Sequence, residues 1–535
     1  MKVRKYIALL SLFFLVFSSC AKQQPVTAKK TNTLRMNVTR EPMTMDPRKG
    51  SEMIGATFHG MMFEGLTRIN ADNSITPAQA QSIEISDDRL TYTFHLRDVM
   101  WSDGSFVTAT DFEKAWKKIL SPDFPAANAP LFYPIKNAEE AKKGLVSIDE
   151  VGISSIDDNT LVVELKKPTP YFLKLTSFCV FFPVKHTLDE LEPGWTEHAG
   201  ENFLTNGPFK LKSWKHNDKI VLEKNPYYWE SSLIALEKIK VSMVRDENTV
   251  LQMYENGELD VIGCSFSPIP KDVLPKYNKK GVINTFSSAA TNSITFNTSK
   301  FPFSNKNIRK AFAYAVNRKE IVDNITQMGE EVATQMIPNC LKTKAAPSYF
   351  KDNSLKKAKK YFAKGLKELD LSAEEFPILT YQYSFSDLGH KLAQTLQQQW
   401  AKNLGVKVQL QQCEHKVFFD KLAKRDYTLA PMFWYAQYHD PMSILERFKY
   451  KANPKNFCDW ENPNYIRLLE KSTFDETPKE REQTLEEAEA LILKEMPITP
   501  LYHGKTIFMV KDHITYKEFP PDNGFLELSR LSIKK

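Results

Sequence analysis

Apolar and polar residues alternate in several short segments, and this period-two pattern predicts β-strands with one buried face. The alternation is clearest at residues 34–38 and 90–97. Two hairpins are predicted where paired segments flank turn residues, at 151–156 with 160–165 and at 209–214 with 220–224. Shorter strands are expected at 259–262, 294–297, 406–410, 507–510 and 514–516.

Apolar residues at helical spacing predict a second set of elements. These helices are expected at 58–66, 112–120, 249–256, 307–316, 356–369 and 390–404. Asp111 is the expected N-cap of the helix at 112–120, and Gly405 is the expected end of the helix at 390–404. Strands and helices alternate from about residue 293 to 497, so the expected fold class is α/β.

The first twenty residues have the pattern of an export signal. A basic start precedes the apolar run at 7–17, which is too short to span a membrane. Ser18, Ser19 and Cys20 resemble a bacterial lipobox, in which Cys20 becomes the lipidated N-terminus. An ordinary cleavage site with a chance cysteine is the alternative. Residues 21–30 then have the composition of a flexible tether.

Composition narrows the function further. The 535 residues include 72 Lys plus Arg and 65 Asp plus Glu, a net charge of +7 without a long block of one sign. Nucleic acid is therefore not an expected partner. Five cysteines follow Cys20, and no CxxC spacing occurs, which excludes zinc ribbons and thioredoxin-type redox sites. One or two disulfides remain open.

Motifs for catalysis are missing from the chain. It contains no GxSxG, HExxH, GxxxxGK[ST] or GxGxxG, and its ten histidines form no i, i+4 pair. We therefore expect no catalytic residue, no metal site and no cofactor. An exported α/β chain without a reaction centre suggests capture of a ligand, not its conversion.

Several longer motifs together resemble the oligopeptide-binding proteins of bacterial peptide ABC transporters, which form extracellular solute-binding protein family 5. They are EPMTMDP at 41–47, FEGL at 63–66, LTYTFHLR at 90–97, WSDG at 101–104, TATDF at 108–112, TNGP at 205–208, NPYYW at 225–229, NGELD at 256–260, FN at 296–297, NIRKA at 307–311 and NR at 317–318. The resemblance runs from about residue 34 to the C-terminus.

The resemblance implies a two-lobed periplasmic-binding-protein fold with a hinge and an additional inserted domain. The export pattern at the start of the chain predicts a signal peptide at 1–19, followed by lipidated Cys20 and its tether at 20–33. The other expected units are lobe I at 34–63, 185–285 and 500–535, inserted domain II at 64–184 and lobe III at 286–499.

The function implied is capture of oligopeptides between two closing lobes and delivery to an ABC permease in the inner membrane. Such a protein is a periplasmic or extracytoplasmic monomer, held to the membrane by its N-terminal lipid, and is not an enzyme. The peptide lies between the lobes as an added β-strand.

Two segments match the ligand-pairing stretches of the family. One is Ser51, Glu52 and Met53; the other is Phe433, Trp434 and Tyr435. For Trp434 the alternative is aromatic packing within a buried strand.

The chain departs from the family at the positions that bind the peptide ends. Gln437 stands where family members have an aspartate that pairs with the peptide amine, and Asp440 could serve instead if the loop is rearranged. Pro431 and, roughly, Thr326 stand where basic residues meet the peptide carboxylate. A neutral amide forms a weaker bond to an ammonium than a carboxylate does.

Two alternatives stay open, and the first of them follows from these departures. In one, the same fold binds a muropeptide or a modified peptide without a standard free N-terminus. In the other, the chain is a surface adhesin or a chaperone-like protein built on this scaffold.

Overall fold

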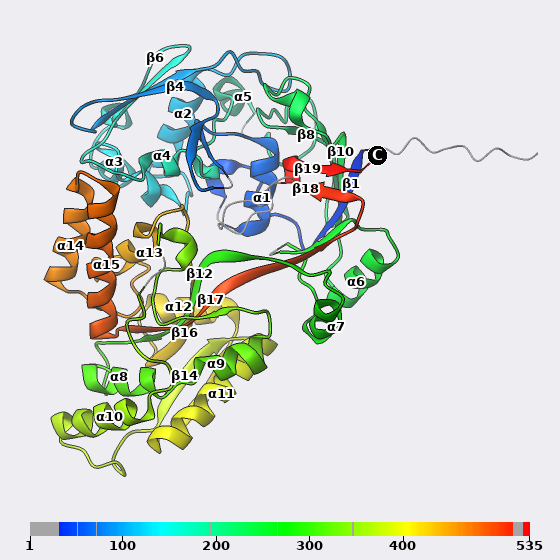
Figure 1. Ribbon diagram of the computed structural model, residues 1–535. Coiled ribbons are helices and arrows are strands. Elements are labelled where there is room, and N and C mark those ends of the chain that lie inside the picture. Colours follow the sequence, from blue (N-terminus) through cyan, green and yellow to red (C-terminus); the bar gives the residue numbers. More distant parts are fainter. Residues whose placement is uncertain are drawn as a thin grey trace, which may run out of the picture.

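The computed structural model describes residues 32–534 except 51, 71, 193, 265, 345–346 and 517–527. Its elements form two lobes and a smaller inserted domain, and two long strands pass from one lobe to the other (Figure 1). The α/β class and the two-lobed architecture expected from the sequence are confirmed. The expected signal peptide and Cys20 lie outside the described residues.

The first lobe is built on β1 (Thr33–Val38). This strand lies between the parallel strands β10 (Lys238–Met243) and β11 (Val261–Gly263). The antiparallel hairpin of β8 (Phe209–Lys215) and β9 (Lys219–Lys224) extends the sheet beyond β10. Leu34, Met36 and Val38 are fully buried, as their alternation predicts. The helices of this lobe are α1 (Met53–Met62), α6 (Glu247–Glu255) and α7 (Leu274–Lys279).

The inserted domain, here the elements from β2 to α4, has its own antiparallel sheet. Strand order is β4 (Ala80–Ile85), β5 (Thr91–Leu96), β7 (Thr160–Glu164) and β6 (Ile153–Asp157). Helix α2 (Ala109–Leu120) packs against β6 and β7. The remaining elements are β2 (Thr67–Ile69), β3 (Ile75–Pro77), α3 (Ala138–Lys142) and α4 (Phe172–Leu175), and α5 (His186–Leu191) follows the domain. The residue limits expected for the domains stay a prediction.

The second lobe consists of three strands and the helices that pack around them. The strands are β14 (Leu379–Ser384), β15 (Val408–Cys413) and β16 (Leu429–Tyr435). The helices are α8 (Lys306–Tyr314), α9 (Arg318–Ile321), α10 (Leu355–Leu369), α11 (Asp387–Leu404), α12 (His415–Ala423), α13 (Met442–Leu445), α14 (Pro463–Phe474) and α15 (Pro478–Glu495). Helix α10 packs on α8, and α14 packs on α15.

Two long antiparallel strands connect the lobes. They are β12 (Asn284–Phe296) and β17 (Ile498–Val510), and they make one sheet of order β15-β14-β16-β12-β17-β11-β1-β10-β9-β8. The register of β12 against β17 shifts between Ser287 and Thr291, a bulge that bends the pair. Strand β13 (Glu331–Val332) pairs with β17, and β18 (Ile514–Tyr516) pairs with β19 (Leu531–Ile533). Hinge motion between lobes is expected at such connections.

Two helix predictions were wrong in detail. Helix α1 ends at Met62, where the chain becomes extended, and it starts five residues earlier than residue 58. Helix α2 is capped by Thr108, not by Asp111. Asp111 instead lies in the first turn, where its carboxylate accepts hydrogen bonds from the Thr108 N–H (3.0 Å) and from the Trp101 indole (3.1 Å). Sequence alone does not separate a cap from the third residue of a capping box.

Cysteines of the described part do not crosslink it. Cys179, Cys264, Cys413 and Cys458 are buried thiols, and none of them is in a disulfide. Burial raises the pKa of Cys179, Cys264 and Cys458 to about 12. These three thiols are therefore protonated and unreactive near neutral pH.

Because three histidines are buried, we expect the free energy of unfolding to decrease in mild acid. Burial lowers the pKa of His59 and His439 to about 4 and that of His503 to about 3. Unfolded histidine has a pKa near 6.5, so between pH 6.5 and 4 the unfolded chain binds more protons than the folded one. The free energy of unfolding therefore falls as the pH falls through this window. Each histidine that takes up a proton only on unfolding contributes a loss of about 1.4 kcal/mol per pH unit.

Urea unfolding at pH 7.0, 5.5 and 4.5 measures this slope. We expect the loss to steepen toward pH 4.5, and His59→Gln to flatten it because glutamine binds no proton. A free energy of unfolding that is unchanged between pH 7.0 and 4.5 would contradict the prediction.

Candidate functional site

Strand β16 has an open edge. Its first residue, Leu429, pairs with Tyr381 of β14, and the described register of these two strands extends no further. The other edge of β16 pairs with β12 along its whole length, from Phe296–Leu429 to Ala290–Tyr435. Among the described residues, this side of β16 thus pairs with no other strand beyond Leu429, and another extended chain can add to it at Phe433.

The hydrogen-bond pattern tells which residues face the open edge. The Ala436 N–H donates to the Ala289 carbonyl at 2.8 Å, so in this antiparallel ladder Trp434 and Met432 also bond to β12. Pro431, Phe433 and Tyr435 therefore point their main-chain groups outward. Pro431 fits this alternation because a proline has no N–H to offer the ladder.

Trp434 is packed as a core residue. Its side chain is 3% exposed and stacks on Phe457, with ring centroids 5.8 Å apart. The Arg447 guanidinium lies 4.9 Å from the Trp434 ring and donates to the Tyr435 carbonyl at 2.5 Å. Phe433, by contrast, is 50% exposed. Ligand contact by Phe433, Trp434 and Tyr435 stays a prediction. The Trp434 ring itself packs in the core beside β16.

The first predicted ligand segment, residues 51–53, leads into the first residue of α1. Glu52 is its N-cap residue, with one carboxylate oxygen accepting from the Met43 N–H at 2.6 Å and the other 2.6 Å from Arg40. Met53 is the first residue of α1 and is half-buried, whereas Ser51 lies outside the described residues. Contact of these residues with a ligand stays a prediction.

A cavity brings α1 together with the segment that follows β16. Its volume is about 180 Å³. Its lining includes Ala56, Thr57, Gly60 and Met61 of α1, Glu64, Arg68 and Lys174, the following residues Ser177, Phe178 and Cys179, and Gln437 and Tyr438. All three parts of the molecule thus meet where the open edge of β16 ends.

Gln437 is held by partners from two other segments. Its amide nitrogen donates to Asn128 Oδ1 at 2.8 Å, and its amide oxygen accepts from Lys455 Nζ at 2.9 Å. Asn128 in turn donates to the Gly50 carbonyl at 2.8 Å. Burial, with Arg447 nearby, lowers the pKa of Lys455 to about 8.

Asp440 is fully engaged inside the protein. The Arg481 guanidinium donates to both of its oxygens, at 2.9 and 2.8 Å, and the Met442 N–H donates at 2.9 Å. Lys174 of the inserted domain lies 3.5 Å away. Although burial alone would raise it, these cations hold the pKa of Asp440 well below its usual range. Asp440 therefore has little capacity left for a ligand amine.

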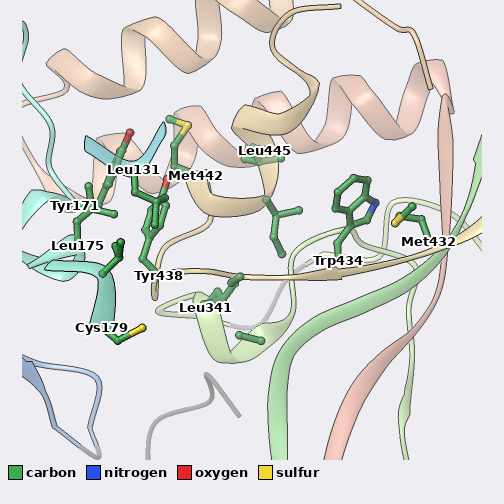
Figure 2. Packing of buried hydrophobic residues seen from close by; sticks show 14 of the residues in the cluster. Leu131, Tyr171, Leu175, Cys179, Leu341, Met432, Trp434, Tyr438, Met442 and Leu445 are labelled. Atoms are coloured by element: carbon green, nitrogen blue, oxygen red, sulfur yellow. The ribbon is translucent and has the colours of Figure 1, made fainter. Parts of the chain in front are cut away.

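Aromatic stacking reinforces this contact between the inserted domain and the second lobe. The rings of Tyr171 and Tyr438 lie 4.8 Å apart at 15° (Figure 2). Arg89 of the inserted domain donates to the Asp475 carbonyl at 3.2 Å. The segment from Gln437 to Asp440 thus docks on the inserted domain instead of continuing the strand.

A second cavity, of about 440 Å³, lies between the inserted domain and α15. One of its walls holds a buried ion pair, Lys342 with Glu489 at 2.5 Å, whose side chains are 3% and 1% exposed. Glu489 also accepts from the Met336 and Ile337 N–H groups at 2.7 Å. These bonds fasten the segment before residue 342 to α15.

Sequence reasoning missed the charged neighbours of the site. Nothing in the local pattern around Lys174, Lys455 and Arg481 separates these residues from solvated charges. Their partners lie far away along the chain. Thr326, suggested as a departure from the family, is buried and donates to Glu330 at 2.7 Å.

Neither a cluster of metal ligands nor a membrane-spanning helix occurs in the part of the chain that the structure describes. Within those ranges, His, Cys, Asp and Glu side chains nowhere gather in a group of three suited to a metal ion. Among the same residues, no helix has both the length and the apolar character needed to cross a bilayer.

Comparisons with known proteins agree with one another. The family described as bacterial extracellular solute-binding proteins, family 5 Middle, matches residues 74–456. Oligopeptide-binding protein OppA of Bacillus subtilis is 39% identical over 507 residues, which cover 93% of each chain. OppA of Haemophilus influenzae in complex with RPPGFSPFR superposes with a TM-score of 0.78 at 26% identity, covering 95% of this chain and 99% of that one. The Escherichia coli murein tripeptide binding protein MppA gives 0.79 at 26% identity, covering 95% and 99%.

Proposed function

This chain belongs to family 5 of the bacterial extracellular solute-binding proteins, and from that premise we propose that it captures oligopeptides and delivers them to an ABC transporter. The observation that carries the proposal is the open edge of β16, which ends at the 180 Å³ cavity shared by both lobes and the inserted domain. A peptide added to this edge gains main-chain hydrogen bonds that do not depend on its sequence. Relatives named for oligopeptide binding support the same function.

Membership of a family of extracellular solute-binding proteins implies a periplasmic or extracytoplasmic location and a role in solute transport. We propose further that Cys20 carries a lipid and that the protein acts as a monomer. Mass spectrometry of the detergent-extracted N-terminal fragment tests the lipid, with Cys20→Ala as the control. An unmodified Cys20 would contradict lipidation, and a dimer mass in solution scattering would contradict the monomer.

Peptides are expected to stabilise the folded protein. A ligand present at 100 times its Kd adds about 2.7 kcal/mol to the free energy of unfolding, which raises the Tm of a chain this size by a few degrees. Thermal unfolding of the chain from Ala21 onward with a pool of tri- to pentapeptides measures the shift. The free amino acids at equal concentration are the control. No shift with any pool would contradict peptide capture.

A modified peptide or muropeptide is the second candidate. One observation favours it: the position expected to bind a peptide amine is a neutral amide, Gln437, already bonded to a lysine. Similarity to a murein tripeptide binding protein is consistent with this ligand class. A Tm shift with a murein tripeptide that exceeds the shift with an unmodified tripeptide would favour it.

A further inference from the structure

The open edge of β16 has a defined end. An added strand cannot continue past Tyr435, because the chain then turns to the inserted domain through Gln437, Tyr438 and Asp440. The Tyr435 carbonyl is itself taken by Arg447. The terminal group of any strand bound there therefore faces Gln437 and the 180 Å³ cavity.

The orientation of the Gln437 amide follows from its partners. Lys455 can only donate, so it must meet the amide oxygen of Gln437. At the other end, the Gly50 carbonyl can only accept, which turns Asn128 so that its oxygen accepts from the Gln437 nitrogen. One amide hydrogen of Gln437 is used in this chain of bonds, and the other remains to donate. Gln437 thus offers a ligand a donor, beside an ammonium group.

The described carboxylates near this end already have partners. Glu446, the one closest to Lys455 in its electrostatic effect, accepts from the Tyr438 hydroxyl at 3.0 Å, and burial raises its pKa. Asp440 is bonded to Arg481 and lies near Lys174. Glu64, on the cavity wall, accepts from the Tyr228 hydroxyl (2.9 Å) and the Trp229 indole (2.7 Å), and Arg68 lies 3.0 Å from it. Lys174 lines the cavity, and Lys455 uses one of its three donors on Gln437.

We propose that the end of the ligand groove at Gln437 binds a hydrogen-bond-accepting group, a carboxylate or an acyl carbonyl, and disfavours a free ammonium. This inference rests on the proposed peptide capture and names the chemistry of one ligand end. The donors come from three segments: Gln437 and Lys455 of the second lobe, and Lys174 of the inserted domain. A ligand ammonium placed there would be set against Lys174 and Lys455, while the described carboxylates nearby already accept from protein donors.

Isothermal titration with four forms of one pentapeptide tests the proposal. The forms are unmodified, N-acetylated, C-amidated, and both N-acetylated and C-amidated. If the acceptor is an acyl carbonyl, acetylation strengthens binding at least tenfold. If it is the peptide carboxylate, amidation weakens binding at least tenfold and acetylation does not. Acetylation that weakens binding tenfold, or equal affinity for all four forms, would overturn the inference while leaving peptide capture intact. No binding of any form would overturn both.

Two lysine variants test whether Lys455 itself, and not the loss of any positive charge, sets the preference for one ligand end. In the wild type the preference is the ratio of the affinities for the favoured and disfavoured forms of the pentapeptide. Lys455→Met is expected to reduce this ratio at least fivefold. Gln437→Asp is expected to shift it toward the peptide with a free amine. Lys451→Met, an exposed lysine four residues earlier, is the matched control and should leave the preference unchanged. An unchanged preference in folded Lys455→Met would contradict the role of Lys455, and the wild-type titrations decide the proposal even if a variant fails to fold.

Discussion

Replacing Glu489 with leucine is expected to lower the free energy of unfolding by about 3–5 kcal/mol, because it strands a buried ammonium. The Lys342 side chain is 3% exposed, and its ammonium lies 2.5 Å from the Glu489 carboxylate. The Met336 and Ile337 N–H groups lose the same acceptor. Unsatisfied buried donors add to the cost of the unpaired charge.

Two controls make this result specific. Glu489→Gln keeps an acceptor of the same shape and should cost less than Glu489→Leu. Asp420→Ala removes the exposed carboxylate on α12 that pairs with Lys424, and this change should cost well under 1 kcal/mol. Urea unfolding followed by circular dichroism measures all three. A loss below about 1 kcal/mol for Glu489→Leu would show that the ion pair does not fasten the wall of the larger cavity.

Phe433→Pro is expected to weaken peptide binding about tenfold or more while leaving the fold intact. The Phe433 N–H points to the open edge of β16, so a proline there removes a donor from the ligand and none from β12. A lost hydrogen bond contributes about 1–1.5 kcal/mol, close to a factor of ten in Kd. The proline ring also occupies space on the ligand side.

Trp434→Pro is the matched comparison, one residue further along. Its N–H points to β12, so the same substitution breaks the ladder and should lower the free energy of unfolding. Titration calorimetry and urea unfolding of both variants check the contrast. Full peptide affinity in Phe433→Pro would contradict strand addition at this edge.

Local pattern was enough to predict most strands. The alternation at 34–38 and 90–97 became β1 and β5, and the hairpin at 151–165 became β6 and β7. These segments are buried on one face, which leaves a period-two signal in the sequence. Helix α1 was harder, because its first turn carries Gly55 and lacks the side-chain cap that marks many helix starts.

The site was predictable only in outline. Strand β16 was found through its resemblance to a family, whereas the bonds that define its end were not. Gln437 meets Asn128 across 309 positions of sequence and Lys455 across 18. Such contacts depend on how the inserted domain docks on the second lobe. The local sequence pattern of either segment does not indicate this docking. Asp440 looked available as an acid, and the structure shows it bonded to Arg481.

Hydrogen–deuterium exchange of β16, resolved to single amides by fragmentation, tests strand addition most directly. Saturating pentapeptide should slow exchange at Phe433, whose N–H group faces the open edge. The Trp434 amide, already bonded to β12, should change little and serves as the internal control. A peptide that binds while the Phe433 amide exchanges at its unliganded rate would contradict the account.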